Sequence, residues 1–313
     1  MDTRRLAAFI KVVDVGSVTR AASLLHVAQP ALSQQMVALE AEFGRALLTR
    51  SPRGVTATPA GRILYHHAHV ILKQEAEARR GVAHPELLVS GEVSIGLAPF
   101  STATLLSIPL LCRVRENFPG VILHIRDYFG TVLSELVMNG VLQMAVLYGR
   151  GPIRGLVFEP IADEEWYVVG AAHFFASQDG PMTLEDVAGA DLLLPSRNSF
   201  LRNRVEEAWR QAGFIPHVAA EIESLHTLGA ALVAGIGISI LPLSVASELK
   251  QMYAIDFMPI EKPNMVAPLS LCIREDAVST PASTAVLDAL RSEIASLRER
   301  CPGLHPHLPR KSV

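Results

Sequence analysis

The sequence has few cysteines and no long apolar run. Its 313 residues include three cysteines, Cys112, Cys272 and Cys301, which lie far apart in the chain. That spacing argues against a disulfide framework and suits a reducing compartment. Cys112 lies in an apolar helical segment, so we expect it to be a buried thiol. No uninterrupted stretch of about 18 apolar residues occurs, which argues against a membrane-spanning helix.

Targeting signals and catalytic motifs are also missing. The first residues, MDTRRLAAFIKVVD, do not form a secretion signal, because their apolar run is short and contains Lys11. We therefore expect a cytoplasmic protein with no membrane attachment. No P-loop, G-x-S-x-G, H-E-x-x-H or G-x-G-x-x-G motif occurs, so neither an enzyme nor a cofactor is indicated. His66 and His69 have a spacing that can share a metal, but no third ligand is evident, so we expect no metal site.

The charges are distributed unevenly along the chain. The net charge is −3, yet residues 1–80 carry 11 Lys and Arg against 6 Asp and Glu, a net of +5, which leaves −8 for the remainder. A basic N-terminal part on an acidic body favours contact with a polyanion such as nucleic acid. The alternative is a chance scatter of charges.

The N-terminal segment has the pattern of a helix–turn–helix. Leu6, Phe9, Ile10 and Val13 form one helical stripe that Gly16 can end, and Ser17 can cap the next helix. A third helix begins at Gln29-Pro30, where proline is tolerated in the first turn. We expect its buried stripe to consist of Leu32, Met36, Leu39 and Phe43, with Gly44 as its end.

A polar face and a hairpin remain outside this predicted core. Gln29, Ser33 and Gln34 lie on the first turns of the third helix, where glutamine can bond the major-groove edge of adenine. A short strand, the turn Ser51-Pro52-Arg53-Gly54 and a returning strand then predict a β-wing. Arg53 at its tip can enter a narrow minor groove, and Arg50 can contact phosphate. The alternative is a solvated polar face on a small helical bundle.

These residues resemble the N-terminal domain of LysR-type transcriptional regulators. The similarity covers about 60 positions and includes Gln29-Pro30-Ala31-Leu32-Ser33, Arg53-Gly54 and Thr58-Pro59-Ala60-Gly61. Within the family, HVAQPALSQQ and RGVTATPAG are most similar to the nitrogen assimilation control type. Two residues depart from the pattern: Ala28 stands where many members have Ser or Thr, and Gln34 where many have Arg. The resemblance implies these DNA-binding residues within a helix–turn–helix of about Val18 to Val37: Ser17, Thr19, Gln29, Pro30, Ser33, Gln34, Arg50 and Arg53.

The rest of the chain predicts a linker helix and a sensing domain. Thr58 and Pro59 open a helix that runs to about Val82, and the resemblance implies that it pairs with a second copy. From Gly91 strands alternate with helices, which predicts a parallel sheet wrapped by helices. The fold is therefore an α+β winged helix-turn-helix, a long linker helix, and a two-lobed α/β effector domain of the type II periplasmic-binding-protein kind. We expect the winged domain to cover 1–58 and the linker to cover 59–86, with the hinge at His84-Pro85-Glu86. We expect the effector domain to cover 87–301, with lobe I at 91–163 and 267–301 and lobe II at 164–266. A flexible tail would follow at 302–313.

Polar residues that follow the predicted strands mark a ligand cleft. Ligands of open α/β sheets bind at the carboxyl ends of strands and at helix N-termini. Hydroxyl groups and helix-end amides suit a small anion, although each such residue can equally be an ordinary helix cap. The resemblance also leaves open a cleft without any ligand. The candidate effector-binding residues are Ser101, Thr102, Gly130, Thr131, Tyr148, Ser196, Asn198, Phe200, Ser224 and Thr227.

The sequence thus predicts a regulator that binds duplex DNA. By resemblance it would be a homodimer or homotetramer that binds an interrupted palindrome. It would contact RNA polymerase, activate or repress transcription, and respond to a small effector. The alternative is a cytoplasmic small-molecule binding protein whose N-terminal helices are a protein-interaction module. DNA affinity separates the two hypotheses, because only the regulator requires it.

Overall fold

The computed structural model describes residues 2–51, 54–83, 89–129, 132–149, 151–176, 178, 180–262, 265–301 and 303–305. The chain forms two compact units, one over most of residues 1–92 and the other over most of residues 93–313. The predicted hinge at 84–86 lies outside the described residues. Among the described residues, no helix is long and apolar enough to cross a membrane.

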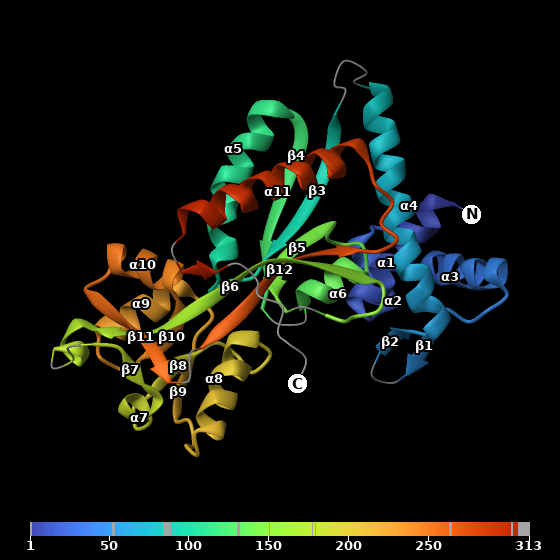
Figure 1. The fold of residues 1–313 in the computed structure, drawn as a ribbon. Coiled ribbons are helices and arrows are strands. Elements are labelled where there is room, and N and C mark those ends of the chain that lie inside the picture. Colours follow the sequence, from blue (N-terminus) through green and yellow to red (C-terminus); the bar gives the residue numbers. More distant parts are fainter. Residues whose placement is uncertain are drawn as a thin grey trace. The chain divides into compact units, whose positions relative to one another are not determined.

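The first unit contains three short helices, a two-stranded wing and one long helix (Figure 1). Its elements are α1 (Thr3–Val15), α2 (Val18–Leu24), α3 (Gln29–Phe43), β1 (Leu48–Ser51), β2 (Gly54–Ala57) and α4 (Pro59–Ala83). This order confirms the predicted winged helix–turn–helix followed by a linker helix.

Capping residues explain where these helices begin and end. The Ser17 side chain accepts a hydrogen bond from the Arg20 backbone amide at the start of α2. Gly16 and Gly44 end α1 and α3 in the left-handed conformation that glycine adopts readily. Ala28 makes no side-chain cap for α3, as its departure from the family pattern predicts.

The helices of the first unit share one hydrophobic core. Phe9, Leu32 and Leu39 are fully buried in it, together with Leu64 of α4. The predicted stripe of α3 is wrong at its last position, because Phe43 is 43% exposed. Phe43 is the final residue of α3, beyond the stretch from Leu32 to Leu39 that the other elements cover.

The second unit has two lobes that share one sheet. Lobe I contains β3 (Ser90–Leu97), η1 (Thr102–Leu106), α5 (Ser107–Asn117), β4 (Gly120–Asp127), α6 (Val132–Met138), β5 (Met144–Tyr148), β12 (Val266–Arg274), α11 (Pro281–Arg300) and β13 (Leu304–His305). Lobe II contains η2 (Ala172–Phe175), β7 (Met182–Thr183), α7 (Leu184–Val187), β8 (Leu192–Leu194), α8 (Phe200–Gln211), β9 (Val218–Glu221), α9 (Leu225–Val233), β10 (Ser239–Pro242), α10 (Leu243–Met252) and β11 (Ile255–Lys262). The strand β6 (Leu156–Ala171) runs through both lobes (Figure 1).

The sheet is mixed rather than parallel. Among the described residues its strand order is β4-β3-β5-β12-β6-β11-β7, with β10 and β13 also paired to β6. The expected parallel pairing holds for β3 with β5 and, in a separate small sheet, for β8 with β9. It is wrong for β12 and β6, which run antiparallel to their neighbours because β6 leaves lobe I and β12 returns to it.

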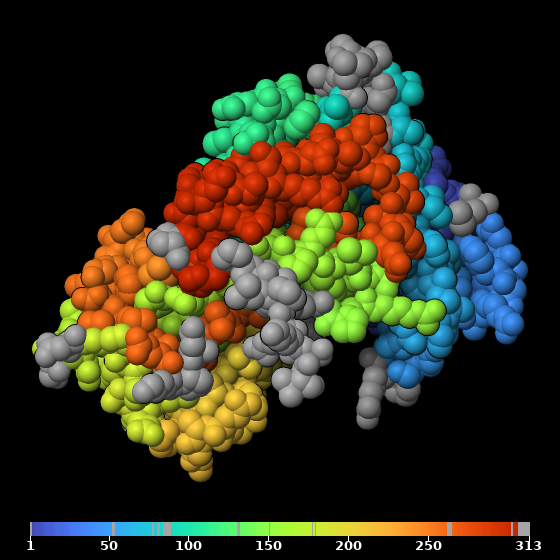
Figure 2. Space-filling model, viewed as in Figure 1, coloured from blue at the N-terminus to red at the C-terminus, as the bar shows by residue number. Residues whose placement is uncertain are grey.

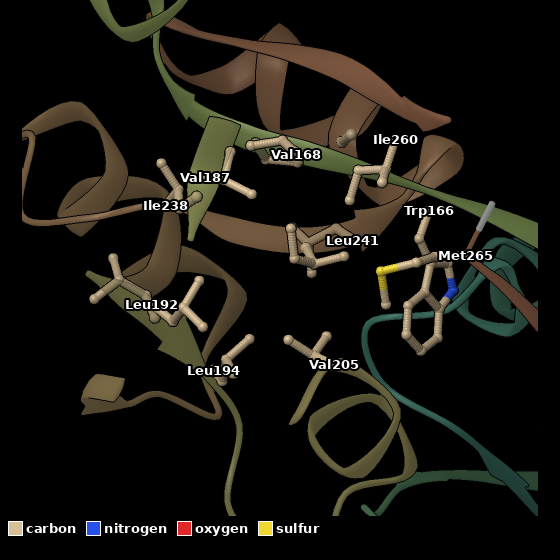
Figure 3. Packing of buried hydrophobic residues seen from close by; sticks show 14 of the residues in the cluster. Trp166, Val168, Val187, Leu192, Leu194, Val205, Ile238, Leu241, Ile260 and Met265 are labelled. Atoms are coloured by element: carbon tan, nitrogen blue, oxygen red, sulfur yellow. The ribbon is translucent and has the colours of Figure 1, made fainter. Parts of the chain in front are cut away.

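Helices cover both lobes. In lobe I, α11 packs against α5 and lies across the face turned toward the reader in Figure 2. In lobe II, Trp166, Leu241, Ile260 and Met265 point toward one another in the core (Figure 3). Leu304 and His305, which we expected in a flexible tail, pair with β6 instead, and Leu304 is nearly buried there.

The cysteines do not share one environment. Cys272 is fully buried on β12, and burial raises the pKa of its thiol to about 12. The expectation of a buried Cys112 is wrong, because this residue is exposed on α5. The apolar run around it is amphipathic, and its buried side is formed by Leu110 and Val114.

Candidate nucleic-acid interface and ligand cavity

The outer side of α3 presents polar groups from its first turns. Gln29 and Gln34 are exposed and Ser33 is half-buried, whereas Leu32 and Met36 face the core. Gln29 Nε2 donates a hydrogen bond to Ser33 Oγ over 2.9 Å. This bond uses one amide hydrogen of Gln29 and leaves its carbonyl oxygen and second N–H free, the pair that adenine requires.

The other predicted DNA-binding residues lie around this helix. Ser17 caps α2, and exposed Thr19 lies in its first turn. Pro30 is exposed in the first turn of α3, and Arg50 is exposed on β1 opposite Val55. Arg53, the predicted wing tip, lies outside the described residues.

Two residues of this surface have features that the sequence reasoning missed. Val37 is 57% exposed two turns after Gln29 on the same face of α3, where an apolar side chain can meet a thymine methyl group. Glu40 Oε1 accepts hydrogen bonds from the backbone amides of Leu47 at 2.8 Å and Leu48 at 3.0 Å. The sequence signal for these bonds is a glutamate near the end of a predicted helix that is followed by a predicted strand.

The wing is also attached to the turn between α1 and α2. The Val55 amide donates to the Gly16 carbonyl over 2.8 Å. A Cβ on Gly54, whose φ is +125°, would lie 2.7 Å from the same oxygen. These contacts hold the wing against the α1–α2 turn, and the Glu40 bonds hold its base against α3.

In the second unit, residues from both lobes line a cavity of about 550 Å³. Ser196 and Asn198 are the two predicted effector residues in its wall. The other lining residues are Pro99, Phe100, Thr104, Asp127, Tyr128, Phe129, Val132, Glu223, Leu225, Val245 and Glu248. Gly130 and Thr131 were also predicted, but they lie outside the described residues.

The lining is acidic, which disagrees with the small anion that we expected. Asp127, Glu223 and Glu248 contribute carboxyl groups, and no described lining residue is a lysine, arginine or histidine. Burial raises the pKa of Asp127 above its ordinary value. An anion placed here would meet like charges without a described basic partner in the wall. The three acids come from β4, from the segment before α9 and from α10, so sequence proximity does not group them.

The remaining predicted effector residues bond to or pack against other residues of the protein. Ser101 is buried and caps η1, and Ser224 caps α9 by accepting from the Thr227 amide. Thr102 is buried, and its hydroxyl lies 2.7 Å from Ser244 Oγ of α10. Tyr148 stacks on Phe200, with ring centroids 5.3 Å apart. Ligand contact by these six residues stays a prediction.

The described residues contain no group of three or more His, Cys, Asp and Glu side chains that could hold a metal. On α4, the rings of His66 and His67 lie edge to face. The His69 ring packs against Tyr65, and burial lowers the pKa of His69. Tyr65 in turn donates to Asp14 over 2.5 Å and so joins α4 to α1.

Comparison with protein families gives two matches. The family described as "Bacterial regulatory helix-turn-helix protein, lysR family" matches residues 3–62, and "LysR substrate binding domain" matches residues 88–295. The nitrogen assimilation regulatory proteins of Escherichia coli and Klebsiella aerogenes are each 41% identical to this chain. These alignments cover 95% and 94% of this chain and 96% of each relative.

Solved structures show the same fold. The crystal structure of full-length CbnR in complex with its target DNA is 25% identical, with a TM-score of 0.63, and the match covers 95% of this chain and all of that one. ArgP from Mycobacterium tuberculosis is 24% identical, with a TM-score of 0.70, and the match covers 98% of this chain and all of that one.

Proposed function

This chain belongs to the LysR family of transcriptional regulators, and from that premise we propose that α3 and the wing bind duplex DNA. The observation that carries the proposal is the Gln29–Ser33 pair on the outer side of α3, opposite the buried Leu32. Gln29 would bond an adenine edge in the major groove. Ser17, Thr19, Pro30, Ser33, Gln34 and Arg50 would contact bases or phosphates around it, and Arg53 would enter the minor groove.

We further propose that two copies bind through α4. Ile63 is 64% exposed and Val82 is 84% exposed on this helix, so the unit does not bury its whole apolar surface. Pairing α4 with the same helix of a second copy would cover them. The dimer would present two α3 helices to an interrupted palindrome, and a homotetramer would combine two such dimers. The crystal structure of CbnR with its target DNA supports the DNA-binding part of this proposal by similarity.

The domain division follows from the same proposal. Residues 1–58 would bind DNA, 59–86 would form the linker and hinge, and 87–301 would sense the effector, with β13 at Leu304–His305 extending the effector domain beyond residue 301. Lobe I would comprise 91–163 and 267–301, and lobe II 164–266. The regulator would work in the cytoplasm and contact RNA polymerase. Its similarity to nitrogen assimilation regulators favours genes of nitrogen assimilation as targets.

The cavity between the lobes would bind the effector. Its three carboxyl groups and its aromatic residues Phe100, Tyr128 and Phe129 favour a small ligand with a positive charge. This revises the anion expected from hydroxyl groups, because the cavity wall contributes acidic side chains as well as Ser196 and Asn198.

A gel-shift assay of the full chain on its own upstream region, followed by footprinting, tests DNA binding. We expect one protected, interrupted site that persists at moderate salt and in the presence of competitor DNA. Loss of all protection when competitor DNA is added would contradict the proposal, because non-specific phosphate binding is sequence-independent.

A further inference from the structure

The two lobes are joined by a buried hydrogen-bond network around Glu164 of β6. Glu164 is only 1% exposed, although it is a carboxylic acid. Its Oε1 accepts from the Thr102 amide at 3.0 Å, and its Oε2 accepts from the Tyr148 hydroxyl at 2.7 Å. Thr102 and Tyr148 belong to lobe I, and both also contact lobe II, through Ser244 and Phe200 respectively. The carboxyl group therefore lies at the joint between the lobes.

No described cationic side chain forms an ion pair with Glu164. Thr102 of η1 and Tyr148 of β5 hydrogen-bond to its side chain, and it pairs along the sheet with Ala267 of β12 and Leu304 of β13. Next to the end of α11, the pKa of Cys301 is raised by burial and by the charge of Glu164, while Arg300 lowers it. The adjacent acid Glu165 pairs with His305. Burial without a cation raises the pKa of Glu164 to about 7.

Tyr148 connects this carboxyl group to the cavity wall. Its hydroxyl lies 3.2 Å from the Phe100 carbonyl oxygen as well as 2.7 Å from Glu164 Oε2. One hydroxyl has one hydrogen, so it can donate fully to only one of these acceptors. Phe100 lines the cavity and has a φ of +55°, a left-handed conformation that is costly for an aromatic residue.

We propose that protonation of Glu164 reverses this chain of hydrogen bonds and thereby stabilises the cavity wall at Phe100. When Glu164 is ionised, Tyr148 donates to Oε2 and the Phe100 carbonyl loses its donor. When Glu164 takes a proton from solvent onto Oε2, that O–H donates to the Tyr148 oxygen, and the Tyr148 hydrogen turns to the Phe100 carbonyl. Both states keep Glu164 and Tyr148 hydrogen-bonded, and only the protonated state restrains Phe100. Glu164 and Tyr148 are thus positioning residues for the wall of the cavity.

Trp166 reports on this network. It lies two residues after Glu164 on β6, and its ring lies 6.0 Å from that of Tyr148. The only other tryptophan is Trp209, a buried residue of α8. The full chain labelled with 5-fluorotryptophan therefore gives two fluorine NMR signals, which Trp209→Phe assigns.

We expect the Trp166 signal to shift with pH at a midpoint of about 7, while the Trp209 signal stays constant. Glu164→Gln should abolish this transition. Tyr148→Phe should move its midpoint to higher pH, because the carboxylate loses a donor that lowers its pKa. Glu165→Gln, which changes the adjacent half-buried carboxyl group that pairs with His305, should leave the midpoint in place. A transition that survives in Glu164→Gln, or no transition between pH 5 and pH 9 in the unmodified chain, would overturn the proposal.

Hydrogen exchange tests the link to the wall. Exchange of a peptide spanning Pro99–Thr104 is compared at pH 6 and pH 8 after correction for intrinsic rates. We expect protection in the unmodified chain to be several-fold lower at pH 8 than at pH 6. If the restraint of Phe100 raises the pKa of Glu164 by one unit, the fall is about tenfold. Glu164→Gln should show the same protection at both pH values. An equal fall in both proteins would show that Glu164 does not act on Phe100.

Discussion

Glu40 Oε1 lies 2.8 Å from the amide nitrogen of Leu47, and this contact ties the end of α3 to the base of the wing. Because the same oxygen also accepts from Leu48, Glu40→Ala leaves two largely buried amides without an acceptor. We expect a loss of about 1–3 kcal/mol in the free energy of unfolding, measured by urea denaturation. DNA affinity should fall as well, because the wing loses its fixed position.

Glu42→Ala is the matched control for that change, since Glu42 lies on the same helix and is exposed. It should cost no more than about 0.5 kcal/mol. Equal losses in the two variants would mean that Glu40 does not position the wing.

Gln29 should determine sequence preference. Gln29→Ala removes the amide that Ser33 orients, and we expect a loss of about 1–3 kcal/mol at the preferred site. Binding to unrelated sequences should change little, so the ratio of the two affinities falls. Fluorescence anisotropy with specific and scrambled duplexes measures both. Gln211→Ala, an exposed glutamine of α8, serves as the control, and uniform losses on all sequences for Gln29→Ala would rule out base reading.

The cavity should prefer a cation. We expect 1,4-diaminobutane to raise the melting temperature of the protein more than succinate, a dianion of similar length, because Glu223 and Glu248 attract the first and repel the second. A ligand at a hundredfold excess over its Kd adds about 2.7 kcal/mol of stability. Differential scanning fluorimetry measures the shift, and Glu223→Gln should reduce it. A larger shift in melting temperature with succinate would support an anionic effector instead.

Stability should depend on pH through Glu164. Its pKa is about 7 in the folded protein, against an ordinary value of 4.5, so the folded state holds this proton more tightly than the unfolded chain. The contribution to stability is complete below pH 4.5 and is lost as the pH rises to about 7, by about 3 kcal/mol. Urea unfolding at pH 5 and pH 8 should therefore show a smaller decline for Glu164→Gln than for the unmodified chain. Identical declines would mean that the carboxyl group is ionised already at pH 5.

Thiol labelling should separate the cysteines. Cys272 is fully buried with a raised pKa, so we expect it to react with a maleimide only after unfolding, whereas exposed Cys112 reacts in the native protein. Mass spectrometry of labelled peptides with and without urea distinguishes the two. Rapid native labelling of Cys272 would show that β12 opens readily.

Local chemistry made much of the fold predictable. The end of α3 at Gly44 follows from a glycine that adopts the left-handed conformation, and the start of α4 at Pro59 follows from Thr58, whose hydroxyl accepts from the Gly61 amide. These signals depend on neighbours within a few residues. The family resemblance supplied the two-lobed arrangement, because the second unit has no equally local signature.

Long-range pairing was not predictable in the same way. The strand β6 extends over 16 residues, and its partners come from distant parts of the chain. The cavity likewise collects Asp127, Glu223 and Glu248 from separate segments. Hydroxyl groups such as those of Ser101 and Ser224 served as helix caps, which is the other role that a serine at a helix start can have. Sequence position alone did not distinguish a cap from a cavity wall.

The continuity of β6 limits how the sensing unit can change shape. Along its length it pairs with β12 from Leu156 to Glu165 and with β11 from Tyr167 to Ala171. The two ladders meet at Trp166, so the lobes can rotate about this residue without breaking either ladder. We therefore expect the cavity to open by a hinge rotation within one strand, whose range is set by how far β6 can bend and twist at that residue.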